Sequence, residues 1–357
     1  MSKAALADAA GLGLRSIVAW EAGETEPTDE SVELIATVLR FPVAFFGAGE
    51  IEEPDPEGAS FRAFSSMTAG QRDAALGAGT LAMEIGRWID ARFELPHPDL
   101  PDLVRFAPEA AAQALRLHWN LGERPIRNMI HLLESHGVRV FSLPTDCAGV
   151  DAFSVWTREV PHMFLTTVKS GERGRFDAAH ELAHLVMHRR GGPRGRQSEV
   201  DADTFASAFL MPQSSLYAKA PRCPNLGTLI TLKKNWSVSV AALTHRLRSL
   251  GRLTEWQYRM LCIEMAKRGY RKQEPEGISH ETSQVMSKVF GALRGEGVTG
   301  PSIAKELAIH PAELGELVFG AVMVPVSGGR QDSRPRVGGR GKLRLATHDG
   351  DPPARRA

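Results

Sequence analysis

Residues 175–184 read RFDAAHELAH, and the run continues as LVM to Met187 without Pro or Gly, which favours one unbroken helix. His180 and His184 are four residues apart, so they share a face from which two imidazoles can bind one metal ion. Glu181 lies beside them, where it can take a proton from a water molecule at the metal and act as a general base. The stretch predicts a metal-dependent hydrolase organised around this helix.

A third protein ligand is expected on the next helix, because a catalytic site of this kind needs three ligands and one open position. Glu199 lies 15 residues after His184, beyond a Gly-rich turn at 191–195 that lets the second helix fold back on the first. Asp201 is the rival ligand, although it is shorter and lies half a turn away from the face of Glu199.

Two more side chains are expected close to the ligands. Asp203 is four residues after Glu199 on the same face, where its carboxylate can accept the remaining N–H of a ligand histidine. His188 lies one turn beyond His184 and either supports the site or lies on the surface. The alternative for the whole cluster is a set of polar helix residues on a solvated face.

The rest of the chain predicts the α+β class, mainly α with a small β-sheet. Short β-branched and aromatic runs at 138–143, 150–156 and 163–168 indicate three strands. Helical periodicity covers most of what remains, at 60–136, 173–190, 196–209, 227–270 and 279–320.

These motifs, with Phe209-Leu210-Met211-Pro212 and the strand Val150–Ser154, resemble the ImmA/IrrE family of bacterial metallopeptidases. The resemblance covers about residues 110–250. It implies a zincin-like peptidase core, an edge strand before the active-site helix and Glu199 as the third ligand. It also implies that the protein cleaves a partner repressor.

The N-terminus carries a second motif, in which two short amphipathic helices at 3–10 and 14–22 are separated by Gly11-Leu12-Gly13. A helix-turn-helix needs this geometry. The pattern resembles Cro/repressor-type, or XRE, domains, and the alternative is an ordinary helical hairpin. The family's usual first helix would lie before residue 1, so we expect a domain that lacks it. The resemblance implies that four residues face DNA, with the arginine at the start of the recognition helix: Lys3, Leu14, Arg15 and Ser16.

The composition is ordinary for a globular protein. There are 43 Lys and Arg residues against 42 Asp and Glu residues, which excludes DNA binding by bulk charge but allows a local basic face. The three cysteines, Cys147, Cys223 and Cys262, form no CxxC pair and fit a reducing compartment. No signal-peptide pattern and no apolar run of about 18 residues occurs, so we expect a cytoplasmic protein without a membrane partner.

Five segments are predicted from these patterns. The expected order is a helix-turn-helix (1–50), a linker and helical connector (51–107), the zincin-like peptidase domain (108–250), a helical C-terminal extension (251–326) and a basic tail without regular structure (327–357). The linker is the acidic, Pro-rich stretch at 50–58.

Taken together, the sequence predicts a metal-dependent endopeptidase of a bacterial or phage-derived regulatory system, with DNA and a protein substrate such as a repressor as partners. Two histidines and one glutamate suit Zn²⁺, and Mn²⁺ or Fe²⁺ also accept this set. Tyr217 and His245 are candidates for the oxyanion partner, with structural roles as the alternative. The rival function is an XRE-family regulator or antitoxin whose peptidase fold is a sensor or scaffold, although a scaffold has no need of Glu181. The oligomeric state is not set, and a homodimer is compatible with either function.

Overall fold

The computed structural model describes residues 1–49, 51, 68–147, 149–189, 195–221, 224–270, 272–322 and 344–345. Most of the predicted linker, of the Gly-rich turn and of the basic tail lies outside the described residues. The protein is mainly helical with one small three-stranded sheet, so the predicted α+β class is confirmed. No helix within the described part of the chain combines the length and apolar character that a bilayer span requires.

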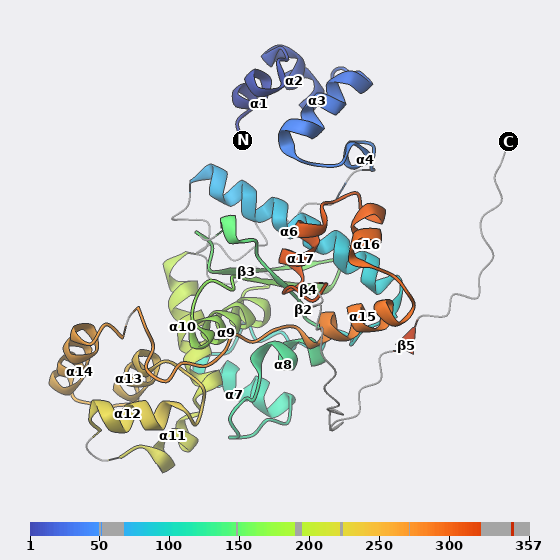
Figure 1. Ribbon diagram of the computed structural model, residues 1–357. Helices are drawn as coiled ribbons and strands as arrows, with labels where there is room; N and C mark the ends of the chain where they lie inside the picture. Colours follow the sequence, from blue (N-terminus) through green and yellow to red (C-terminus); the bar gives the residue numbers. More distant parts are fainter. Residues whose placement is uncertain are drawn as a thin grey trace, which may run out of the picture.

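Four short helices form a group at the N-terminal end of the molecule (Figure 1). They are α1 (Lys3–Ala10), α2 (Leu14–Glu21), α3 (Asp29–Leu39) and α4 (Val43–Phe46). The hydroxyls of Ser2 and Thr28 accept main-chain N–H groups at the starts of α1 and α3. The helix α1 ends at Gly11, whose φ of 67° lies in the left-handed region. Three alanines and one isoleucine fill the shared interior, namely Ala7, Ala10, Ala36 and Ile17.

The sheet consists of β2 (Arg139–Ser142), β3 (Ala152–Thr157) and β4 (Val160–Leu165), in the order β2-β4-β3. β4 pairs in parallel with β2 and antiparallel with β3. The three predicted strands are confirmed, although β4 begins three residues before the predicted start. The reason is a two-residue turn at Arg158 and Glu159, both with positive φ, which returns the chain directly from β3 into β4.

Each face of the sheet has its own hydrophobic core, because side chains alternate along every strand. One core joins Met163 to the helices α7 (Pro108–His118), α8 (Met129–Ser135), α9 (Gly171–Met187) and α10 (Arg196–Leu210). The opposite core joins Phe141, Phe153 and Phe164 to residues of α6 (Ala69–Asp90) and of the C-terminal helices.

The helix α9 is the centre of the first core. It lies between the sheet and α10, and most of its residues are buried. Ser170 caps its start, with its hydroxyl accepting the N–H of Arg173. Gly195, with a φ of 82°, precedes α10, which packs along α9. This pairing brings the first turn of α10 to the middle of α9.

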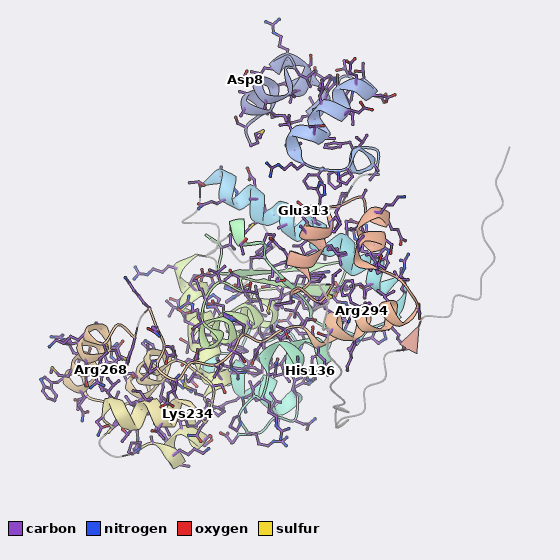
Figure 2. All side chains as sticks on the ribbon, viewed as in Figure 1. Asp8, His136, Lys234, Arg268, Arg294 and Glu313 are labelled. Carbon is purple, nitrogen blue, oxygen red and sulfur yellow. The ribbon has the colours of Figure 1, made fainter. Side chains whose placement is uncertain are left out.

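The remaining helices divide between the two cores. The first core is extended by α11 (Gln213–Lys219), α12 (Leu226–Lys233), α13 (Val240–Ser249) and α14 (Glu255–Lys267). The second contains α15 (Gln284–Gly295), α16 (Gly300–Glu306) and α17 (Pro311–Leu317). In Figure 2, Lys234 and Arg268 mark the α12–α14 end, away from Asp8 in the N-terminal group and Arg294 at the end of α15.

Residues 272–283, here called the connecting segment, run from the first set of helices to the second. The Glu281 carboxylate accepts the N–H of Met129 at 2.7 Å, at the start of α8, and pairs with Arg175. The main chain of the segment passes close to the start of α9, where a Cβ on Gly171 would lie 2.6 Å from the Ser279 carbonyl oxygen. The segment is therefore fastened to α8 and α9.

Part of the predicted tail differs from expectation. Arg344–Leu345 forms a two-residue strand, β5, antiparallel to β1 (Phe93–Glu94). The sequence predicted no regular structure here, because the tail is rich in Gly, Pro and basic residues and poor in large apolar ones.

Candidate metal centre

Three side chains from two helices meet at one point beside the sheet. His180 and His184 come from α9 and Glu199 from the first turn of α10. One ligand atom from each lies within 4.8 Å of the other two. The Nε2 atoms of the histidines are 3.2 Å apart, and the Glu199 carboxylate oxygens lie 3.3 Å from His180 Nε2 and 3.6 Å from His184 Nε2. Within the described residues this is the one such group, and it contains the three ligands expected from the sequence.

The rival ligand, Asp201, is not part of this group. Its carboxylate accepts an N–H from the Gln197 side chain at 2.9 Å, along the outer side of α10. The helical geometry explains the difference, because residues two positions apart, such as Glu199 and Asp201, are separated by about 200° around the helix axis.

Asp203 lies on the far side of His180, where its carboxylate is 2.9 Å from the histidine Nδ1. This contact favours a proton on Nδ1 and turns a lone pair of Nε2 towards His184 and Glu199. Burial lowers the pKa of His180, but the hydrogen bonds with Asp203 and Glu199 and the charge of Glu181 outweigh burial and raise the pKa to about 10. The position therefore strongly favours a bound cation, be it a proton or a metal ion.

His188 also contacts a proposed ligand. Its Nδ1 is 2.9 Å from the Nδ1 of His184, so one of the two nitrogens carries the shared proton. Burial lowers the pKa of His188. The sequence left a supporting role and a surface position open, and the structure places this ring half-buried beside the site.

Glu181 is almost completely buried, with 4% of its surface exposed. The hydroxyl of Ser154, on β3, donates to Glu181 Oε2 at 2.7 Å. From the sequence, Ser154 was expected only as part of a strand, and its contact with Glu181 was not predicted. The alternation along β3 could have indicated it, since Ala152 and Ser154 share the face that packs on α9.

The two candidates for an oxyanion partner are engaged elsewhere. The Tyr217 hydroxyl donates to the Leu250 carbonyl oxygen at 2.9 Å, and the His245 ring packs edge-on against Tyr258. His245 does line a cavity of about 1240 Å³ between the α9–α10 pair and the α13–α14 helices, and Asp203 forms part of the same wall. The metal centre thus has a large cavity directly behind Asp203.

The residues expected to contact DNA lie apart from the metal centre, in the N-terminal group of helices. Arg15 is exposed at the start of α2, and Leu14 keeps 48% of its surface exposed. Ser16 is half-buried in the same turn, while Lys3 forms an ion pair with Glu21 across α1 and α2. Arg15 and Leu14 are therefore placed where a DNA groove could reach them.

The donor set fits a divalent metal ion. Two imidazole nitrogens and a carboxylate form the combination that Zn²⁺ uses in catalytic sites, and Mn²⁺ and Fe²⁺ also accept it. When the proton of His180 is on Nδ1, Nε2 carries a lone pair that can bind a metal ion or accept a proton. The fold thus places a candidate metal site and an adjacent carboxylate on one helix, the arrangement that metallopeptidases use.

Comparison with protein families agrees with this class. Residues 133–248 match the family model of the IrrE N-terminal-like domain, a peptidase family, and residues 1–46 match a helix-turn-helix model. Among curated proteins, none matches the chain. One segment of the chain is therefore similar to the IrrE N-terminal-like domain and another to a helix-turn-helix domain, which matches the predicted fusion.

Proposed function

We propose that this protein is a metal-dependent endopeptidase of a bacterial or phage-derived regulatory system, and that it cleaves a repressor or another regulatory protein. The observation that supports this best is the position of Glu181 on the same helix as His180 and His184. A site that only stores or senses a metal needs ligands, whereas an adjacent carboxylate held within the protein interior serves proton transfer.

Each residue of the site has its own proposed role in peptide hydrolysis. A divalent ion held by His180, His184 and Glu199 would polarise the scissile carbonyl and make a water molecule a better nucleophile. Glu181 takes the proton of the attacking water and passes it to the amine that leaves. Asp203 fixes the orientation of the His180 ring, and the packed pair of α9 and α10 excludes bulk water from one side.

We further propose that the substrate is an extended peptide that lies along β3, an edge strand of the sheet. The carbonyl oxygen of Asp151 accepts the N–H of Thr166 on the side of β4. In an antiparallel pair, successive residues direct their main-chain N–H and C=O groups alternately towards the partner strand and away from it. The main-chain groups of Ala152 and Trp156 therefore point to the outer side of β3, where no strand of the sheet pairs with them.

The helix-turn-helix supports DNA as a second partner, with Arg15 as the proposed base-reading residue. It also motivates the alternative function, an XRE-type regulator or antitoxin whose peptidase fold acts as a sensor or scaffold. The two functions differ in one requirement, because only the peptidase needs the proton-accepting carboxylate of Glu181.

The experiment follows from that difference. The purified protein is analysed for bound metal and incubated with repressors encoded beside its gene, and products are identified by mass spectrometry. Glu181→Gln should keep the metal and lose about 10²–10⁴-fold in cleavage rate, because an amide cannot accept the proton. Asp201→Asn is the matched control, since this carboxylate is near the site but outside the ligand group. Cleavage by Glu181→Gln at the wild-type rate would refute the general-base role of Glu181, and the absence of any cleavage by the wild-type protein would refute the enzyme assignment.

A further inference from the structure

The contact between β3 and the catalytic helix assigns a role to Ser154, and this inference rests on the proposed function. We propose that Ser154 is a positioning residue that holds Glu181 in the orientation needed for proton transfer. Its hydroxyl is 2.7 Å from Glu181 Oε2 and 3.3 Å from the main-chain oxygen of the same residue. A serine hydroxyl has one proton, and the shorter distance assigns that proton to the carboxylate.

The sheet fixes Ser154 firmly. Its partner across the hairpin is Met163 on the central strand β4, and 2% of its surface is exposed. β3 packs directly on α9, so neither the donor nor the acceptor can move without disturbing the core. A glutamate has three side-chain torsions, and a hydrogen bond to a rigid strand removes most of that freedom.

The same bond suits both protonation states of Glu181. When the carboxylate is ionised, Oε2 accepts the Ser154 proton and Oε1 takes the proton of the water. When Oε1 carries that proton, Oε2 becomes a carbonyl oxygen and still accepts from Ser154. Glu181 can therefore take the proton and deliver it to the leaving amine from one oxygen without turning over.

The alternative is that Ser154 is only a small residue that lets β3 approach α9. Alanine would serve that purpose equally well, since Ala152 occupies the neighbouring position on the same face. Ser154→Ala therefore keeps the packing and removes the hydrogen bond alone. Ser142→Ala is the matched control: this serine is as buried and lies in the same sheet, but its hydroxyl donates to the Glu316 carbonyl oxygen and accepts the Phe319 N–H, and it has no bond to Glu181.

The first test is kinetic and uses a peptide that spans the cleavage site in a repressor, or, if no repressor is cut, one selected from a random decapeptide library. Ser154→Ala should lower kcat about 10–100-fold with unchanged KM and metal content, because a small misplacement of a catalytic group has this effect. Ser142→Ala should not lower kcat. Ser154→Thr, which restores a hydroxyl, should recover activity, and Ser154→Ala should have no further effect in the Glu181→Gln background.

The second test does not depend on activity. In a crystal structure of Ser154→Ala, the Glu181 carboxylate should leave its wild-type position or occupy several positions. Ser154 has no positioning role if that carboxylate stays in place, or if kcat of Ser154→Ala remains within about twofold of wild type. If the wild-type protein cleaves nothing, the proposed function fails on its own, and the crystal structure still decides whether Ser154 orients Glu181.

Discussion

We expect Asp203→Ala to weaken metal binding about 10-fold. Removing the carboxylate partner of a metal-binding histidine typically lowers metal affinity about 10–100-fold. Asp203 Oδ1 lies 2.9 Å from the Nδ1 of His180, a full hydrogen bond. However, 47% of the Asp203 side chain is exposed to solvent, so water can partly replace it. We therefore expect the lower end of this range, a tenfold loss of metal affinity, which corresponds to about 1.4 kcal/mol of binding free energy.

The assay is a competition titration of Zn²⁺ between the protein and a chromophoric chelator at neutral pH. Asp201→Ala is the control, because it removes a carboxylate two residues away whose partner is Gln197 rather than a histidine. An Asp203→Ala protein that binds Zn²⁺ as tightly as wild type would show that the Nδ1 contact does not support the ligand. An equal loss in Asp201→Ala would instead indicate a general effect of negative charge.

Three further outcomes are expected. Gly171→Ala should lower the free energy of unfolding by about 1–3 kcal/mol, because the added Cβ would lie 2.6 Å from the Ser279 carbonyl oxygen. Gly174→Ala on the same helix should raise it by about 0.5–1 kcal/mol, because the added Cβ meets no neighbouring atom within 4 Å and alanine favours a helix. Chemical denaturation measures both. Burial lowers the pKa of His162 from 6.5 to about 4, so the folded state binds fewer protons than the unfolded state between these values and stability falls as pH falls from about 6.5 to 4. Relative to His162→Phe, wild type should lose about 2 kcal/mol between pH 7 and pH 5, and parallel pH curves for the two proteins would contradict this. Arg15→Ala should weaken operator binding by about 1–3 kcal/mol in a gel-shift titration, and unaltered binding would show that Arg15 reads no base.

Features that depend on the spacing of neighbouring residues could be predicted from the sequence. The helical face shared by His180 and His184, the three strands and the helices around them depend on neighbours along the chain. Asp203 was also predictable as a partner of a histidine, because residues four apart on α10 lie on one face. The hairpin between β3 and β4 was harder, since Arg158 and Glu159 form its turn in place of the Asn-Gly or Asp-Gly pair that marks such turns.

Contacts between distant segments could not be predicted from one sequence. The partner of Glu181 is 27 residues away on another element, and nothing in the sequence around Ser154 distinguishes it from other strand serines. The position of Gly171 beneath the connecting segment is a contact across more than 100 residues. In both cases the information lies in how elements pack, which periodicity does not encode.

Because helices cover both faces of the sheet, the segment that resembles a peptidase domain cannot be transferred to another protein on its own. The segment that matches the IrrE N-terminal-like domain, 133–248, contains all three strands but neither α6 nor α15–α17. Excised alone, it would present Phe141, Phe153 and Phe164 to water, the kind of large apolar surface that drives aggregation. A recombination event that moves this segment into another gene must therefore bring both flanking parts with it, or join it to a protein whose own helices can cover those three rings.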